Sequence, residues 1–483
     1  MQGNTVIMVT FGVYLAVMLF IGWLAGRGMK ENEEGFFLGN RSFGFYSTAM
    51  SSAATDTSGW IFIGAVGYAY AAGAEFMWML GAYALGGMTS WLVLGPALRR
   101  QSEELGALDL AEYFEKRLKD HSHLIRTTAT IIILLFFIPY LGSQLTSAGI
   151  TMNTIMQMDY NLAMFLCMVI IVLYSFSGGY RAVMWTDSIQ GTVMCLVLAV
   201  FPIWLIHYCG GWTTLWVKIQ EFDPLMATAS YGRAPMAIAS YVLGMMVMGF
   251  GTCGQPQNLQ RYFSTKDADN TFFDGVWVKG AFNLISMTGS CVLGITARVI
   301  LPDLANPEYA FPSLAFQLLP PVIVGIIIAG IFSAIQSTYD SMLILSAQSI
   351  SRDLVGTLGK RELSDKQRVA LSRWVIVILG ILSFVLAILN IDSVFALIIY
   401  AQSVFAAAFG PLLILLLFWP HRVDKRGAFC GMIVGTVVTT AWYASGLNAY
   451  IWEVAPGSLS AVIAILLLSK PSELKMPAGA EAS

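Results

Sequence analysis

Long apolar segments recur along nearly all of the 483 residues, and they limit the possible folds more than any other feature of the chain. A helix that crosses about 30 Å of hydrocarbon needs about 20 predominantly apolar residues. By that measure the sequence predicts an all-α membrane protein with about thirteen transmembrane helices. The predicted spans are residues 5–26, 45–71, 75–98, 125–156, 161–177, 188–207, 236–256, 273–300, 318–349, 368–390, 393–418, 427–445 and 449–468.

The composition agrees with a bilayer environment and excludes several classes of protein. Hydrophobic residues make up 57% of the chain and charged residues 12%. The net charge of -2 and the absence of a basic stripe exclude nucleic acid as a partner. The six cysteines form no Cys-x-x-Cys pair and the four histidines are scattered, so no metal centre or catalytic cluster is predicted. We expect a protein that is not an enzyme and needs no obligatory protein partner.

Lys and Arg residues are unequally distributed between the two sides of the predicted bundle. Short cytoplasmic loops carry an excess of both residues. With the N-terminus outside and an odd number of spans, nearly all basic residues, Lys279 among them, fall on the cytoplasmic side, and only Lys218, Arg233 and Arg298 fall outside. The sequence therefore predicts a multi-pass plasma-membrane protein with a cytoplasmic C-terminus. Residues 108–118, LDLAEYFEKRL, predict a short helix on the inner membrane surface.

Asp56 is a carboxylate inside the second predicted span, in the segment SSAATDTSGW (51–60). Charges within spans are costly and indicate function by default. The small polar residues around Asp56 suit an unwound helix whose carbonyl groups face a cavity. The alternative is a structural charge that caps a helix end or pairs with a neighbouring Lys or Arg.

A second interruption lies five spans later, in GMMVMGFGTCGQPQ (244–257). Four glycines precede Pro256, whose ring does not fit a regular helix interior. Broken first helices in two five-span halves are typical of transporters with an inverted repeat and a binding site near the midplane. Helix packing through glycine is the alternative explanation.

Oxygen-bearing side chains gather in the ninth predicted span, in SAIQSTYDSMLIL (333–345). Ser337 and Thr338 are adjacent, Ser341 lies one turn below Ser337, and Asp340 shares that side. Such hard oxygens suit an alkali cation, whereas hydroxyls bonded to their own helix are the alternative. Asp187, at the start of the sixth predicted span, either caps that helix or serves as a further cation ligand.

Together these segments resemble the sodium:solute symporter family, and most of all its bacterial sodium/proline symporter branch. The resemblance covers nearly the whole chain, with several segments matching in the same order. The matching segments are FFLGNRSFG, SSAATDTSGW, LLFFIPYLGS, SGGYRAVMWTD, GFGTCGQPQNLQRYF, SAIQSTYDS, FGPLLILLLFW and RGAFCGMIVG.

The resemblance implies a ten-helix inverted-repeat core of the LeuT-like, five-plus-five kind, at about residues 45–418 of one transmembrane domain (1–470), with a short cytoplasmic tail (471–483). It also implies a sodium-coupled symporter of the bacterial inner membrane that works by alternating access. The main sodium site would consist of Ala54, Asp56, Thr57, Ala334, Ser337 and Thr338. A possible second sodium position would use Asp187, Asp340 and Ser341.

The same resemblance implies where the solute binds and what it is. The solute would lie near Ser58, Gly59, Trp60, Tyr140, Gln144, Met248, Thr252 and Gln255. Met248 and Thr252 stand where the proline branch has aromatic residues. Proline or another small amino acid is therefore the expected solute, with a different small zwitterion or carboxylate as the alternative. A transporter-like membrane sensor is the less favoured function, because no signalling module is visible in the sequence.

Overall fold

A computed structural model of the chain describes residues 2–27, 32–268, 270–358, 363–389, 393–471 and 474. Within these residues the secondary structure is helical apart from one isolated bridge between Phe43 and Thr265. The predicted all-α class is therefore confirmed. Nearly all of the predicted cytoplasmic tail, residues 471–483, lies outside the described residues.

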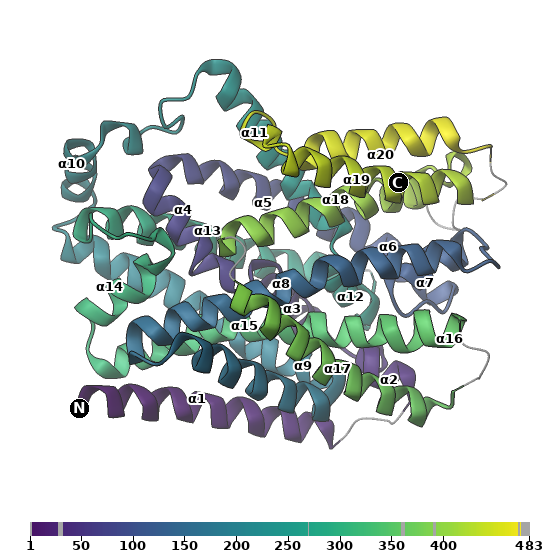
Figure 1. The fold of residues 1–483 in the computed structure, drawn as a ribbon, viewed down its shortest axis with the longest axis horizontal. Helices are drawn as coiled ribbons and strands as arrows, with labels where there is room; N and C mark the ends of the chain where they lie inside the picture. Colours follow the sequence, from purple (N-terminus) through teal and green to yellow (C-terminus); the bar gives the residue numbers. More distant parts are fainter. Residues whose placement is uncertain are drawn as a thin grey trace.

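The helices run roughly side by side along one direction, and the short pieces lie between them or at their ends (Figure 1). The first part of the chain forms α1 (Gln2–Gly26), α2 (Glu33–Leu38), α3 (Phe45–Thr57), α4 (Gly64–Ala72), α5 (Met77–Thr89), α6 (Gly95–Glu104), α7 (Leu110–Arg117), α8 (Leu124–Met156) and α9 (Tyr160–Tyr208). The rest forms α10 (Trp212–Phe222), α11 (Pro235–Phe250), α12 (Pro256–Ser264), α13 (Asn270–Ile300), α14 (Ala310–Leu318), α15 (Pro321–Gln348), α16 (Val355–Leu358), α17 (Asp365–Leu389), α18 (Val394–Phe418), α19 (Lys425–Ala444) and α20 (Val454–Leu468).

The apolar helices of the structure can be compared with the thirteen predicted membrane spans. The described residues hold ten helical segments long and apolar enough to cross a membrane, and the shorter apolar helices Tyr160–Leu173 and Val454–Leu468 come in addition. One of the ten segments, Gly59–Glu104, contains a turn between α4 and α5, where Gly73 has a φ of +63° (Figure 1). A Cβ atom at Gly73 would lie 2.4 Å from the Met226 carbonyl oxygen, so the turn requires glycine. The predicted count of thirteen spans is not confirmed by the length and composition of these helices.

The fifth and sixth predicted spans, with a loop between them, are joined in the structure. The chain is helical from Tyr160 to Tyr208, with a break only at Gly179, where φ is +56°. Residues 180–187 therefore belong to the second half of α9. Asp187 lies well inside that half, so the interpretation of Asp187 as a helix cap is wrong.

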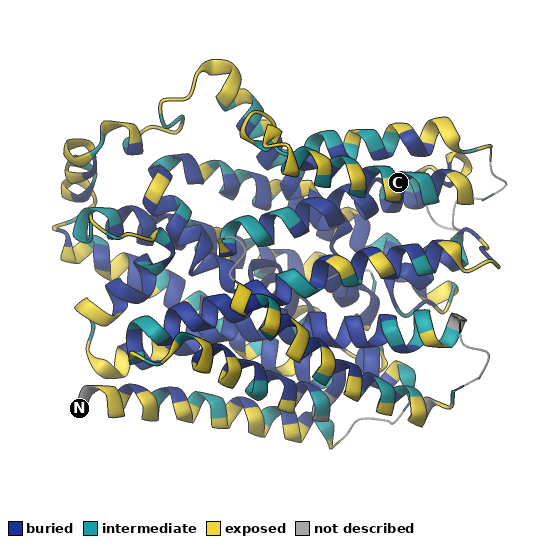
Figure 2. Cartoon of the chain, in the orientation of Figure 1, coloured by how far each residue is buried: buried dark blue, intermediate teal, exposed yellow. Residues whose placement is uncertain are grey.

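Burial identifies α15 as one of the two most buried membrane-length helices among the described residues, together with α18. Of the apolar window in α15, 83% is buried, against 22% of the window in α1. Figure 2 shows the same contrast, with α15 largely dark blue and the outward side of α1 yellow. α15 packs against α1, α3, α8, α9 and α17. A polar group on α15 therefore needs a partner from a neighbouring helix, because neither lipid nor water reaches it.

Candidate functional site

The second predicted span breaks where the small polar segment predicts it. α3 ends at Thr57, and Ser58 adopts a φ of +46°, which is rare for a residue with a Cβ atom. A short 3₁₀ turn, Gly59–Ile61, follows before α4 begins. The Ser58 N–H donates to the Ala54 carbonyl oxygen at 3.1 Å, which closes the last turn of α3. Strained backbone of this kind is common at binding sites.

The end of α3 contacts the hydroxyl-rich part of α15. The Ser337 hydroxyl lies 3.3 Å from the Ala54 carbonyl oxygen and 3.2 Å from that of Ala334. The Thr338 hydroxyl donates to the Thr55 carbonyl oxygen at 2.9 Å, and the Thr55 hydroxyl donates to the Ser337 carbonyl oxygen at 3.2 Å. All of these residues are buried. The structure thus brings Ala54, Ala334, Ser337 and Thr338 together across two distant helices.

The side chains of Thr57 and Asp56 have different partners. The Thr57 hydroxyl bonds within α3, to the carbonyl oxygens of Ala53 and Ala54 at 2.8 and 3.2 Å. The Asp56 carboxylate lies 3.9 Å from the ammonium group of Lys279 on α13. Asp56 is therefore paired with a cation from another helix, and the contacts of its carboxylate lie toward α13.

A second buried polar cluster surrounds the guanidinium group of Arg261 on α12. Its Nη2 atom lies 2.9 Å from Asp187 Oδ2 and also donates to the Ser341 hydroxyl, while Nε donates to the Ser51 hydroxyl at 3.0 Å. Asp340 is fully buried next to Ser341, whose hydroxyl lies 3.3 Å from Asp340 Oδ1. Asp187 and Ser341 therefore lie together as predicted for a second cation position, with the guanidinium group between them.

The other predicted break, between α11 and α12, contains the 3₁₀ turn Gly251–Gly254, and Pro256 opens α12. This is a favourable place for proline, since its missing N–H would have no partner in the first turn of a helix. A Cβ atom at Gly254 would lie 2.3 Å from the Phe405 carbonyl oxygen on α18. Glycine at position 254 therefore allows the turn Gly251–Gly254 to lie close to the backbone of α18.

Several of the predicted solute-binding residues form one connected group. The Gly59 N–H donates to Gln144 Oε1 at 2.9 Å, and Trp60 is fully buried beside Ser58 and Gly59. The Tyr140 hydroxyl accepts a hydrogen bond from Gln402 Nε2 at 3.1 Å. This group therefore joins the break in span 2 to α8 and α18.

Met248, Thr252 and Gln255 lie on the other broken helix and are also buried. Met248 packs with Ile399 and Phe395, and the Phe395 ring lies edge-on to Trp60 with 6.2 Å between centroids. The hydrogen bonds of the Thr252 hydroxyl and of Gln255 Oε1 go to Gly249 and Gln257 within the same segment. Met248 is thus linked to the Trp60 side of the site by packing, and the structure gives no such link for Thr252 and Gln255 among the described residues.

Sequence reasoning missed four residues of this region. Tyr83 donates to Gln402 Oε1 at 3.0 Å, and both residues are buried between α5 and α18. Lys279 and Arg261 were assigned to the cytoplasmic surface, but both side chains are buried in ion pairs. A signal was present, because Gln402 and Lys279 interrupt predicted apolar spans in the same way as Asp56.

Several buried polar atoms of the site have no hydrogen-bond partner among the described residues. They are both carboxylate oxygens of Asp56, Trp60 Nε1 and Gln144 Nε2. Buried polar groups are nearly always paired, so each unpaired atom needs an explanation. Binding of a polar solute or ion is an explanation that accounts for all of these unpaired atoms.

A polar cavity of about 380 Å³ lies beside the C-terminal half of α8. It is lined by Thr146, Ile150, Tyr160, Asn306, Glu308, Tyr309 and Ser393. None of the predicted solute-binding residues lines this cavity.

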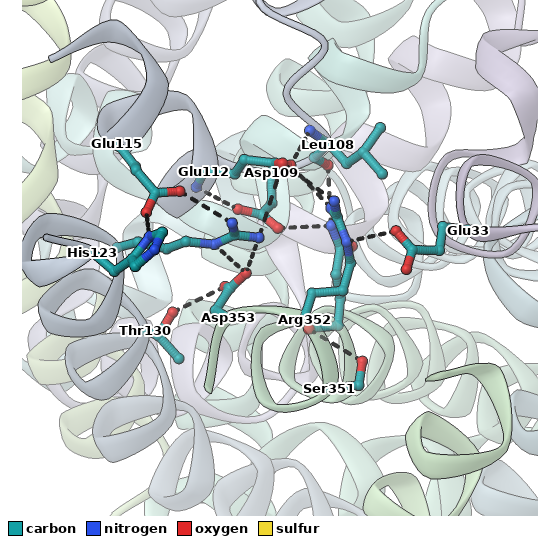
Figure 3. Close-up of polar contacts among 12 residues, drawn as sticks. Glu33, Leu108, Asp109, Glu112, Glu115, His123, Thr130, Ser351, Arg352 and Asp353 are labelled. Atoms are coloured by element: carbon teal, nitrogen blue, oxygen red, sulfur yellow. Dashed lines mark hydrogen bonds and ion pairs between the residues drawn. The ribbon is translucent and has the colours of Figure 1, made fainter. Parts of the chain in front are cut away.

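A network of charged side chains joins α2, α7, α8 and the end of α15 (Figure 3). Arg126 contacts Asp353 at 2.7 Å and Glu115 at 3.1 Å, and Arg352 contacts Glu112 at 2.9 Å and Glu33 at 2.9 Å. The helix predicted over residues 108–118 is observed as α7, which Asp109 caps by accepting from the Glu112 N–H at 2.8 Å. Its place on the inner membrane surface stays a prediction.

The charges of this network set the pKa values of its acidic residues outside the spans. Burial opposes ionisation of Glu112, but Arg352, Arg126 and Lys116 outweigh it and lower the Glu112 pKa to about 2. Burial and the neighbouring charge of Glu112 together raise the pKa of Asp109. Glu112 is thus a permanent anion that holds two arginines in place.

Comparison with known proteins gives matches over nearly the whole chain. Residues 36–435 match the profile of the Sodium:solute symporter family. The High-affinity proline transporter PutP of Bacillus subtilis (strain 168) is 32% identical over 94% of this chain and 95% of its own length. The Sodium/proline symporter of Escherichia coli (strain K12) is 30% identical over 96% and 93%.

Solved structures with the same fold include a substrate-bound, outward-open Na+-coupled sialic acid symporter. It superimposes with a TM-score of 0.81 at 22% sequence identity and covers 97% of this chain and 99% of that one. MhsT in complex with L-phenylalanine gives a TM-score of 0.53 at 15% identity, over 87% and 97%. The LeuT-like inverted-repeat fold that the sequence predicts is therefore confirmed.

Proposed function

Since the chain belongs to the sodium:solute symporter family, we propose that the solute it moves together with sodium is a small amino acid, with proline as the first candidate. Sodium-coupled symport across a membrane is the activity of the family. Proline is the solute in the names of the relatives that match most of this chain. The residues of the site and the identity of the solute are the two parts of this proposal.

The observation that carries the sodium part is the contact between the broken end of α3 and the middle of α15. The Ser337 hydroxyl oxygen lies 3.3 Å from the Ala54 carbonyl oxygen and 3.2 Å from the Ala334 carbonyl oxygen. Thr57 and Thr338 add oxygen atoms directly beside them. We assign the sodium ion to this group of neutral oxygens, with the Asp56 carboxylate at a neighbouring position of α3 and paired with Lys279.

The proposal includes a second sodium position, at Asp187, Asp340 and Ser341. A positive charge next to this position restricts the binding of sodium there. The Arg261 guanidinium group already contacts Asp187 and Ser341. A sodium ion there would meet a fixed positive charge, so its binding would require that guanidinium group to move. One sodium ion per cycle is therefore the stoichiometry we favour.

The solute part rests on unpaired buried donors beside the broken end of α3. Gln144 Nε2 and Trp60 Nε1 are buried donors without a partner among the described residues, and a carboxylate group of the solute would satisfy both. Ser58, Gly59 and Tyr140 frame one side of this position. Met248 supplies an apolar wall from α11, with Thr252 and Gln255 farther along that broken helix. The flexible Met248 side chain adapts to solutes of different shapes. A small zwitterion or carboxylate other than proline is therefore the second candidate.

Sodium bound between α3 and α15 would hold the break at Ser58 in the shape that accepts the solute. Each ligand then raises the affinity for the other by the same factor. With the N-terminus outside and the C-terminus in the cytoplasm of a bacterial inner membrane, an inward charge gains about 2.3 kcal/mol per 100 mV. That energy supports roughly fortyfold accumulation, because about 1.4 kcal/mol corresponds to a factor of ten.

The test is binding of labelled proline to the purified protein in sodium chloride and in potassium chloride. We expect saturable binding only with sodium, and competition by unlabelled small zwitterions ranks the candidate solutes. A competitor that binds tenfold more tightly than proline would replace proline as the solute. Equal binding in both salts would contradict the coupling. Counterflow of labelled solute in vesicles then separates a carrier from a passive channel, because only an alternating site exchanges solute.

A further inference from the structure

Lys279 is a charged residue in the interior of the bundle. It lies on α13, one of the segments of membrane-spanning length, and its side chain is 1% exposed. Its ammonium group donates to the Ser52 hydroxyl at 2.8 Å and lies 5.5 Å from the centroid of the Trp91 ring. A lysine at such a position is costly unless its charge is compensated.

The compensating group is Asp56. Asp56 Oδ2 lies 3.9 Å from Lys279 Nζ, and no other ion pair of Asp56 is found among the described residues. Neither oxygen of this fully buried carboxylate has a hydrogen-bond partner in the part of the chain that the structure describes. The pair is therefore held by charge at a distance longer than a hydrogen bond, and each member needs the other to remain ionised.

Helix geometry explains why Asp56 faces Lys279 and not α15. Ser52 and Asp56 are four residues apart on α3, so they share one face of that helix. Ser52 contacts Lys279 on α13 and Asn258 on α12, whereas Thr55, on the neighbouring face, contacts Ser337 on α15. The carboxylate and the neutral oxygens between α3 and α15 thus lie on different sides of the same helix.

The surroundings of the pair hold further polar groups. Asn283 lies one turn after Lys279 on α13 and is fully buried, and neither atom of its amide group has a partner among the described residues. Asn258 Nδ2 is also without a described partner. If the ammonium group were removed, oxygen ligands from Asp56 and Asn283 would be available to a small cation at this place.

We propose that Lys279 is a tethered cation of the transport site: its ammonium group neutralises Asp56, so that the chain binds one sodium ion, at the neutral oxygens between α3 and α15, where Asp56 is not a direct ligand. The proposal rests on the sodium site assigned above and adds a residue that sets the number of ions. It makes Lys279 a positioning residue for the charge of Asp56. Without its ammonium group, the chain would need a second cation from solution.

The experiment is equilibrium binding of radioactive sodium to the purified full chain, with Lys279→Met, Asp56→Asn and the double variant compared with the wild type. We expect one sodium ion per wild-type chain and two per Lys279→Met chain, with a Hill coefficient above one. Asp56→Asn leaves the ammonium group uncompensated beside the sodium site, so its sodium affinity should fall at least tenfold. The double variant removes both charges and should again bind one ion, within about threefold of the wild-type affinity.

Lys279→Arg keeps the charge and is the matched control, which should bind one ion. Lys279→Met binding one ion with unchanged affinity would overturn the proposal, as would a double variant no better than Asp56→Asn. If Lys279→Met fails to fold, the double variant still tests the proposal. A lysine with a purely structural role would not let the double variant regain the sodium affinity that Asp56→Asn loses. Absence of sodium binding to the wild type, or wild-type binding by Ser337→Ala, would instead contradict the sodium site itself.

Discussion

The broken end of α3 and the charge network around α7 both gather polar groups in the interior of the molecule, but they satisfy them differently. In the network each acidic group meets a cation or a hydrogen-bond donor, as Glu112 does with Arg352 and Asp353 does with Arg126 and Thr130. Around α3, Asp56, Trp60 and Gln144 keep buried atoms without a described partner. Complete pairing is typical of a structural contact, whereas incomplete pairing at a strained backbone is typical of a binding site.

This difference separates two kinds of mutational effect. Breaking a paired charge in the network should reduce folding stability and leave ligand affinity alone. Changing the region around α3 should alter ligand affinity with a smaller effect on stability. The four predictions below test that separation, from the largest expected effect to the smallest.

Arg126→Met should have the largest effect, because it leaves Asp353 and Glu115 buried without their cation. Breaking a buried ion pair by removing one partner costs about 3–5 kcal/mol. We expect a lower thermal unfolding temperature in detergent, with unchanged sodium affinity in the protein that remains folded. Arg126→Lys is the control and should lose less stability. If Arg126→Met unfolds at the same temperature as the wild type, the network does not stabilise the fold.

Gly59→Ala should reduce solute affinity by roughly tenfold. A Cβ atom there would lie 2.8 Å from Ile335 Cγ1 and 2.9 Å from Gln144 Oε1, so it would displace the Gln144 amide group that we assign to the solute site. The measurement is solute binding at saturating sodium. Gly44→Ala is the matched control, because a Cβ atom at Gly44 meets nothing within 4 Å. Equal solute affinity in both variants would show that the backbone at Gly59 does not border the solute.

Ser337→Ala and Thr338→Ala should each raise the sodium concentration for half-maximal binding by roughly tenfold, or about 1.4 kcal/mol. Each removes one hydroxyl oxygen from the contact with α3, and the unfolding temperature should change little. Ser333→Ala is the control, since the Ser333 hydroxyl lies one turn away on α15 and bonds to Tyr14 and Ala329. If all three variants respond to sodium like the wild type, the assignment of sodium to α15 is wrong.

The smallest effect concerns pH. The Glu112 pKa, lowered from 4.5 to about 2, means that its carboxylate stabilises the fold above pH 4.5 and that this contribution is lost as the pH falls toward 2. The difference in unfolding temperature between the wild type and Glu112→Gln should therefore be constant from pH 8 to about 5 and shrink below that. A difference that changes between pH 8 and 6 would contradict the pairing of Glu112 with its cations.

Much of this organisation follows from patterns in the sequence. Apolar length predicts the helical bundle, and the small polar residues before Trp60 predict the break in α3. The contact between Ala54 and Ser337 was expected from the family resemblance. Lys279 was misplaced because counting basic residues in loops treats each as solvated, and the partner that buries it, Asp56, lies on another helix. Asp187 was placed at a helix end because two consecutive glycines favour a loop, while in the structure only Gly179 leaves the helical conformation.

α15 and the turn that follows it connect the two regions, from Ser337 at the ion site to Asp353 in the network. This turn, Ser349–Leu354, lies between Gln348 and α16 and is wound as a π-helix. A π-turn holds one residue more than an α-turn. Rewinding it to α-helical pitch would rotate Arg352 and Asp353 by about 100° and leave Ser337 where it is. The extra residue of this turn therefore sets the direction in which Arg352 and Asp353 leave the helix toward α7 and α8, independently of the ion site at Ser337.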